Sequence, residues 1–293
     1  MAASRLKILI IGDIVGKPGR RIVREQLPRL RREWGVDLVI ANAENSAAGS
    51  GITLRIFRDL RGAGIDLMTM GDHAWKRRDN LDVYQKEDRI LRPMNYPEAA
   101  MGTGRIVIET EGGVKVGVVV VLGRVFMEHV DCPFRTLDAV LDSFEDDVKV
   151  RIVEFHAEAT IEKMAAGWHL DGRVSCVFGT HTHVPTADDR ILPGGTAYIS
   201  DLGMTGPYDS VIGRRADAVL HKFLTAMHAP FTVAEGNVHM AGALLEVDPA
   251  TGRAITFRRV DAREAGAGEF DITGPLRVEG PAGEGAEDGD PTD

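Results

Sequence analysis

Short apolar runs alternate with amphipathic segments in the first third of the chain. Residues 6–11, 37–41 and 65–70 are apolar runs of the length typical of buried strands. Between these runs, apolar side chains recur at helical spacing, first from Ile22 to Trp34 and then from Ile52 to Leu60. Strands that alternate with helices predict a mostly parallel sheet with helices packed against it.

The pattern changes after residue 100. Residues 104–123 predict a β-hairpin with Gly112-Gly113 at its turn. Further on, we expect strands over 148–156, 173–183 and 194–200, helices over 134–147, 158–168 and 214–227, and an antiparallel pair over 239–248 and 254–261. From about Gly266 the chain is rich in Gly, Glu, Asp and Pro, which predicts a disordered acidic tail. We therefore expect one domain over 1–265 and a tail over 266–293.

Composition narrows the class of protein. With 293 residues, 44% of them hydrophobic, the chain can bury a large core. Its net charge of −9 argues against a protein that coats nucleic acid. No apolar run approaches the ~18 residues of a membrane span, so we expect no membrane partner. The two cysteines, Cys132 and Cys176, form no disulfide framework, which fits a reducing compartment. We expect a cytoplasmic protein that forms a homo-oligomer.

Residues of the types that bind metals follow five of the predicted strands. They are Asp13, Glu44 with Asn45, Asp72 with His73, His156, and His181 with His183. In open α/β sheets, ligands bind beyond the carboxyl ends of the strands, so these side chains can meet in one crevice. Each residue alone has an ordinary explanation as a helix cap or a core histidine. Five such strand ends in one chain instead predict a metal centre.

The types of ligand indicate which metals the centre takes. Three imidazoles, together with carboxylate and amide oxygens and no thiolate, suit Mn, Fe, Zn or Co. Seven ligands exceed what one tetrahedral ion needs, and they suit two ions that share a bridging carboxylate. Two such ions generate a bridging hydroxide near neutral pH and hold a phosphoryl group for attack. His73, next to a predicted ligand, is a candidate general acid; the alternative is that it only orients Asp72.

Several sequence motifs resemble a known family. Besides Asp13 they are NAENSAAGSGIT (42–53), GDHAW (71–75), RPMNYP (92–97), FHAEAT (155–160) and the long run GTHTHVPTADDRILPGGTAYISDLGMTGPYDSVIG (179–213). Together they are similar to the YmdB-like branch of the calcineurin-like metallophosphoesterases over residues 6–262. The resemblance implies an α/β fold, a four-layer α/β/β/α sandwich, with a dinuclear metal site. It also implies phosphodiesterase activity on 2′,3′-cyclic nucleotides or related small phosphoesters.

The resemblance also assigns roles by position. It implies that Glu44 bridges the two ions and that His73 is the catalytic histidine. It also implies that the coordination of the first ion is completed by Asp13, Asn45 and His183, and that of the second ion by Asp72, His156 and His181. We expect iron or manganese as the metal, with zinc or cobalt as alternatives. The family usually has an asparagine where this chain has Asp72. The extra carboxylate is expected to hold metal more tightly and to weaken the attraction for an anionic substrate.

Two other functions stay open at this point. One is a regulatory protein whose metal site senses or scaffolds with little turnover. The carboxylate of Asp72, where the family usually has an asparagine, is the feature that favours this alternative. The other is a metal-dependent hydrolase of carboxyl esters or amides, which would use the same hydroxide. The leading hypothesis is a dinuclear-metal phosphodiesterase, because His73 and six of the seven ligands match the family pattern.

Overall fold

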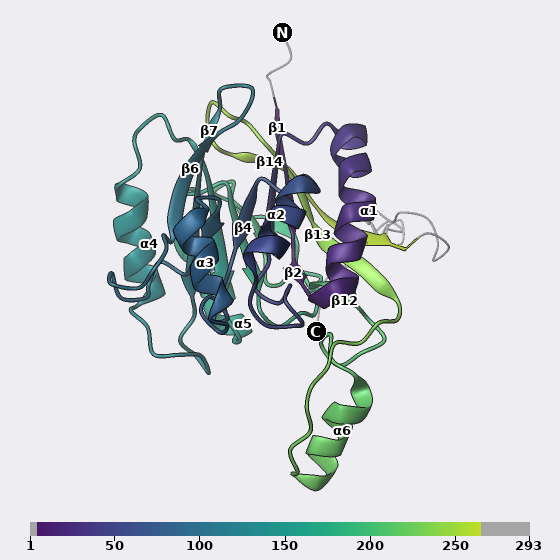
Figure 1. Ribbon diagram of the computed structural model, residues 1–293. Helices are drawn as coiled ribbons and strands as arrows, with labels where there is room; N and C mark the ends of the chain where they lie inside the picture. Colours follow the sequence, from purple (N-terminus) through teal and green to yellow (C-terminus); the bar gives the residue numbers. More distant parts are fainter. Residues whose placement is uncertain (1–4, 265–293) are drawn as a thin grey trace, which may run out of the picture.

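Two β-sheets form the centre of the computed structural model, which describes residues 5–264 (Figure 1). The strands are β1 (Leu6–Ile11), β2 (Asp13–Ile14), β3 (Leu38–Asn42), β4 (Leu67–Thr69), β5 (Ile90–Leu91), β6 (Arg105–Glu109), β7 (Lys115–Leu122), β8 (Val150–His156), β9 (Cys176–Thr180), β10 (Arg190–Ile191), β11 (Ala197–Ile199), β12 (Met204–Pro207), β13 (Val238–Val247) and β14 (Ala254–Arg263). The helices are α1 (Gly16–Trp34), α2 (Leu54–Gly62), α3 (Asp79–Lys86), α4 (Pro133–Asp142), α5 (Thr160–Leu170) and α6 (Ala216–Thr225).

Both sheets are mixed, with parallel strands at their centres. The first has the order β2-β12-β13-β1-β3-β4-β5, and β14 pairs with β13. In it β1, β3, β4 and β5 run parallel, with Ile8 opposite Leu38, whereas β13 runs antiparallel to β1. The second sheet has the order β10-β11-β9-β8-β7-β6, in which β7, β8, β9 and β11 are parallel. The carboxyl ends of the parallel strands therefore gather at one edge of each sheet.

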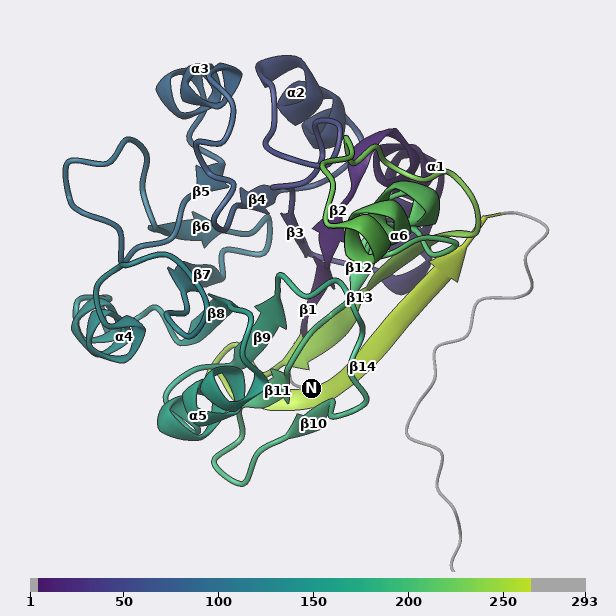
Figure 2. The ribbon, with the colours of Figure 1, turned by 90° about the horizontal axis from the view of Figure 1, so that it is seen from below.

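The helices cover the outer faces of the two sheets. Seen from below, α1, α2 and α3 lie on one side of the paired sheets, and α4 and α5 lie on the other (Figure 2). The architecture is thus the expected four-layer α/β/β/α sandwich. The chain reaches it by placing β1 to β5 in one sheet and β6 to β11 in the other, and then returning to the first sheet with β12, β13 and β14.

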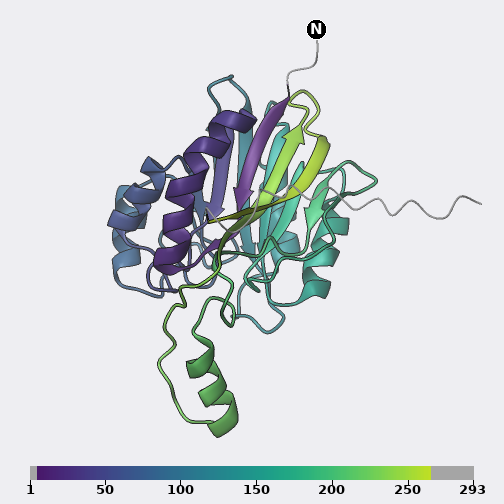
Figure 3. The same ribbon diagram turned by 90° about the vertical axis from the view of Figure 1, so that its right-hand side faces the viewer.

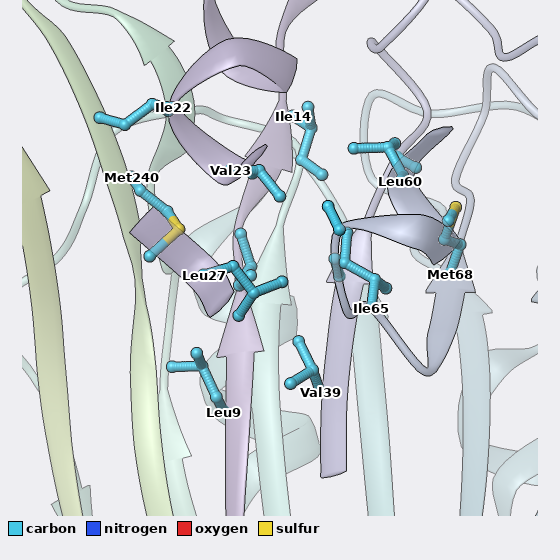
Figure 4. Packing of buried hydrophobic residues seen from close by; sticks show 14 of the residues in the cluster. Leu9, Ile14, Ile22, Val23, Leu27, Val39, Leu60, Ile65, Met68 and Met240 are labelled. Atoms are coloured by element: carbon cyan, nitrogen blue, oxygen red, sulfur yellow. The ribbon is translucent and has the colours of Figure 1, made fainter. Parts of the chain in front are cut away.

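Three layers of buried apolar side chains hold the sandwich together. Along β1, Leu9 packs beneath α1 with Leu27 and Val39 (Figure 4), whereas Ile8 and Ile10 point into the layer between the sheets. Successive strand residues point to opposite faces, and both faces of β1 are covered. This explains why the chain shows continuous apolar runs rather than alternation. The third layer lies between the second sheet and helices α4 and α5.

Helix α6 projects from the sandwich at the end opposite the start of β1 (Figures 1 and 3). Among its residues Val219 is buried, whereas Leu220, Phe223 and Leu224 are exposed. Within residues 5–264, none of the helices has the length and apolar character that a membrane crossing requires.

The structure confirms the long elements and adds short ones that the sequence pattern did not predict. The hairpin is confirmed, with a Gly113 amide that donates to the Thr110 carbonyl at its turn. The antiparallel pair β13–β14 is also confirmed. Strands β2, β5, β10 and β12 were not predicted, because two to four residues carry no period. Helix α3 was not predicted either. The predicted tail over 266–293 lies outside the described residues, and the domain boundary stays a prediction.

Two phenylalanines test where the stability resides. Phe178 is fully buried between the sheets, whereas Phe223 on α6 is 82% exposed. We expect Phe178→Ala to lower the free energy of unfolding by about 3–5 kcal/mol, because it leaves a cavity in a packed layer. Phe223→Ala should change it by less than about 0.5 kcal/mol. Urea denaturation followed by circular dichroism measures both, and equal losses would contradict this description of the core.

Candidate functional site

All eight residues selected from the sequence lie where strands of both sheets end. Asp13 begins β2, Glu44 and Asn45 follow β3, Asp72 and His73 follow β4, His156 is the last residue of β8, and His181 and His183 follow β9. The structure brings all of them together, because each lies within 3.9 Å of at least one other. The first sheet supplies five of these residues and the second sheet supplies three.

Four of these residues form a compact group that can hold a metal ion. One ligand atom from each of Glu44, Asp72, His156 and His181 lies within 4.8 Å of those of the others. The His156 Nε2 atom is 3.1 Å from Asp72 Oδ1 and 3.4 Å from Glu44 Oε2. The His181 Nδ1 atom is 3.3 Å from the same Asp72 oxygen and 3.2 Å from His156 Nε2. Glu44 and His156 are buried, and Asp72 and His181 are partly exposed.

Asp13, Asn45 and His183 form a second group. The His183 Nε2 atom is 3.2 Å from Asn45 Oδ1 and 3.9 Å from Asp13 Oδ1. Asp13 is fully buried, and its Oδ1 atom has no hydrogen-bond partner. A buried carboxylate oxygen without a partner is costly to keep, so an atom in this position is suited to bind a cation.

The outward ring nitrogens of two histidines define which inward atoms carry lone pairs. The His183 Nδ1 atom is 2.9 Å from the carbonyl oxygen of Ile212, to which it donates. When the ring is neutral, its Nε2 atom therefore presents a lone pair to Asn45 Oδ1, which is itself an acceptor. The His181 Nε2 atom faces Glu158 Oε2 at 3.3 Å, and its Nδ1 atom faces Asp72 Oδ1 at 3.3 Å. Acceptors that face acceptors need cations between them, so this set of donor atoms fits bound metal ions.

The pKa values of the carboxyl groups and His156 follow from the same crowding. Burial raises the pKa of Asp13, and it raises the pKa of Glu44 to about 8. Burial opposes ionisation of Asp72, but hydrogen bonds from His156 and His181 outweigh it and hold its pKa well below the usual value. Burial also opposes protonation of His156, yet Glu44 and Asp72 raise its pKa well above the usual value. Protons thus sit among these groups in the metal-free protein, and metal must displace them.

His73 lies at the rim of the two groups. Its side chain is 21% exposed, and its Nδ1 atom is 3.0 Å from Asn45 Nδ2 and 3.4 Å from Glu44 Oε1. Its Nε2 atom is 3.7 Å from Asp72 Oδ2. Burial lowers the pKa of His73 to about 4, so the ring is neutral at pH 7. The Asn45 amide donates to Nδ1, and the ring hydrogen is therefore on Nε2.

Backbone geometry at two positions determines how the ligands meet. His181 and His183 have φ values of 94° and 65°, a left-handed conformation that a non-glycine residue adopts only when its surroundings enforce it. A Cβ atom on Gly71 would lie 2.1 Å from His156 Nε2, so only glycine allows the imidazole to approach Glu44. The Gly71 amide also donates to Glu44 Oε2 at 2.8 Å.

A buried ion pair beneath the His181–His183 loop was missed by the reasoning from sequence. The Lys163 Nζ atom lies 2.8 Å from Asp201 Oδ2 and donates to the Thr180 carbonyl at 2.7 Å. The same Asp201 oxygen accepts from the backbone amide and the hydroxyl of Thr182. Asp201 follows β11, so the rule that selects polar residues after strands would have found it. Lys163 gives no such signal, because a lysine in a helix is normally exposed.

Comparison with known proteins places the chain in a family. The model of the family described as YmdB-like protein matches residues 9–260. A 2′,3′-cyclic-nucleotide 2′-phosphodiesterase of Bacillus subtilis is 41% identical over 255 residues, which cover 87% of this chain and 96% of that protein. A solved structure of a hypothetical protein from Thermus thermophilus is 43% identical, with a TM-score of 0.83, over 88% of this chain and 99% of the other.

A second solved structure, described as a novel phosphatase from Mycoplasma pneumoniae, is 35% identical with a TM-score of 0.84, over 89% of this chain and 94% of the other. Both structures match the sandwich across nearly all the described residues. The extent of the family match and the identities of these relatives lead to one conclusion: the chain belongs to the YmdB-like protein family.

Proposed function

We propose that this protein is a metal-dependent phosphodiesterase that hydrolyses 2′,3′-cyclic nucleotides or related small phosphoesters. The observation that carries the proposal is the convergence of carboxyl, amide and imidazole ligand atoms in two neighbouring groups, one of which contains Glu44. The Bacillus subtilis relative, described as a phosphodiesterase for this substrate class, supports the choice of reaction.

The two groups divide into binding sites for two ions. In this proposal Glu44 lies between them, Asp13, Asn45 and His183 hold one ion, and Asp72, His156 and His181 hold the other. When bound, the ions supply a nucleophile at neutral pH and positive charge for the phosphate oxygens. We propose iron or manganese, because oxygen and imidazole ligands without thiolates suit these metals. The cytoplasmic location and the homo-oligomer stay predictions.

We propose that His73 contacts the leaving group of the substrate. Neither ring nitrogen is committed to a metal ion, and its 21% exposure lets a substrate reach it. The Nε2 hydrogen is the one that the ring can donate in a hydrogen bond to the developing alkoxide. In a 2′,3′-cyclic phosphodiester the leaving group is a ribose hydroxyl, which needs a proton as the ester bond breaks.

Metal content and activity on the same sample test the proposal. Protein depleted of metal should be inactive, and Mn²⁺ should restore hydrolysis of a 2′,3′-cyclic nucleotide as it binds at two ions per chain, measured by elemental analysis. Binding should weaken as the pH falls below about 8, because Glu44 must lose a proton to bind metal. A carboxyl ester assayed in parallel should be hydrolysed slowly.

Two outcomes would contradict this proposal. A protein that binds no more than one ion per chain, with manganese or with iron in excess, is not dinuclear. A protein that binds two ions but hydrolyses neither the cyclic nucleotide nor bis-(p-nitrophenyl) phosphate is a metal-binding protein without the proposed activity, which is the regulatory alternative.

Replacement of His73 by alanine tests its role. We expect turnover of the cyclic nucleotide to fall about 10²–10⁴-fold, with both metals retained, because the leaving oxygen loses its proton donor. The loss should be much smaller with bis-(p-nitrophenyl) phosphate, whose leaving group needs no proton. Steady-state kinetics on both substrates makes the comparison. Equal losses on the two would instead assign His73 a role in positioning.

The carboxylate of Asp72 adds one negative charge to the site. Asp13, Glu44 and Asp72 together offset three of the four positive charges of two divalent ions. We expect Asp72→Asn to lower the KM for an anionic diester about 3- to 10-fold, since one more positive charge attracts it, and to weaken metal binding. Asp217→Asn, on exposed α6, changes the net charge equally and is the matched control. An unchanged KM and metal affinity in Asp72→Asn would rule out this electrostatic role.

A further inference from the structure

Glu154 is a buried acid that the proposed reaction does not use. It lies within the otherwise apolar end of β8, two residues before His156, so both side chains point to the same face of the second sheet. Its side chain is fully buried. Within residues 5–264, the group at ion-pair distance is the His156 ring, whose Nδ1 atom is 3.7 Å from Glu154 Oε1. A carboxyl group in such a place needs a function that offsets its cost.

The hydrogen bonds of Glu154 lead to His156. The Oε1 atom lies 2.7 Å from Thr180 Oγ1 and 2.7 Å from Asn42 Nδ2. An amide nitrogen can only donate, so Oε1 accepts from Asn42, and it also accepts the hydroxyl hydrogen of Thr180. The single hydroxyl hydrogen of Thr180 therefore goes to Glu154.

The direction of this bond determines the tautomer of His156. Thr180 Oγ1 is 2.8 Å from His156 Nδ1. Because its own hydrogen is committed to Glu154, the hydroxyl accepts from Nδ1–H. When the ring gives up one proton to bind metal, Nδ1 keeps its hydrogen, and Nε2 is the atom whose lone pair faces Glu44 and Asp72. Asn42 extends the chain to the first sheet, because its Oδ1 atom accepts from the backbone amide of Glu44 at 3.0 Å.

We infer that Glu154 and Thr180 are positioning residues for His156. They fix its ring orientation and its Nδ1–H tautomer, so that Nε2 is available to the metal ion in the group of Glu44, Asp72 and His181. The inference rests on the proposed function, since it concerns metal binding by that site. Partners of this kind for metal-ligating histidines typically affect metal affinity about 10- to 100-fold.

Substitutions of Thr180 test this relay of hydrogen bonds from Glu154 through Thr180 to His156. In metal-depleted protein titrated with Mn²⁺, we expect Thr180→Val to weaken binding of one of the two ions about 10- to 100-fold and to leave the other unchanged. Thr180→Ser keeps the hydroxyl and should bind within about threefold of the wild type. Thr69→Val is the matched control, because Thr69 is a buried threonine of β4 whose hydroxyl donates to the Ala41 carbonyl. Thr180→Ala replaces the valine variant if that one does not fold.

A second substitution asks whether the two residues act through one chain of hydrogen bonds. Glu154→Leu should weaken binding of the same ion. The double variant Glu154→Leu/Thr180→Val should lose no more affinity for that ion than the weaker-binding single variant. Wild-type binding of both ions by Thr180→Val overturns the relay, as does an equal loss in Thr180→Ser or Thr69→Val. A wild type that binds no ion overturns the proposed function itself.

Discussion

Acceptor atoms that face one another in a buried space are the constraint on which this structure depends. Asp13, Asn45 and His183 bring ligand atoms together in one group, and Glu44, Asp72, His156 and His181 do so in the other. Burial raises the pKa of Glu44 to about 8, so these groups share protons when no cation is bound. Bound metal ions would replace these protons and satisfy the acceptor atoms. The fold at this edge of the sheets holds the acceptor atoms close together.

The sandwich makes such crowding possible by fixing the backbone on which the ligands stand. Parallel strands of both sheets end at the same edge, so each ligand needs only one or two residues beyond its strand. Where the chain must depart from ordinary conformations, other groups enforce the geometry. Lys163 and Asp201 hold the loop that carries the left-handed His181 and His183, and Gly71 leaves room for His156. Rigid surroundings of this kind preorganise a site for chemistry.

Hydrogen bonds connect His156 and Glu44 to the buried polar residues behind them. The relay from Glu154 through Thr180 to His156 brings a further buried carboxyl group near the site. Asn42 joins that relay to Glu44, and so one hydrogen-bond network spans both sheets. The candidate metal site therefore depends on the packing of the two sheets, because each sheet supplies only part of its residues.

The sequence by itself determined the long strands and helices and the polar residues that follow the strands. Those features are local, since a continuous apolar run such as 6–11 reports burial on both faces, and Asp13 stands beside it in the chain. The resemblance to a family supplied the four layers. Only the tertiary structure decided that β13 lies between β12 and β1, that Asp201 supports the histidine loop, and that Glu154 meets Thr180 across neighbouring strands. These are contacts between residues far apart in the chain, and the ring tautomers depend on them, so no local pattern of hydrophobic and polar positions encodes them.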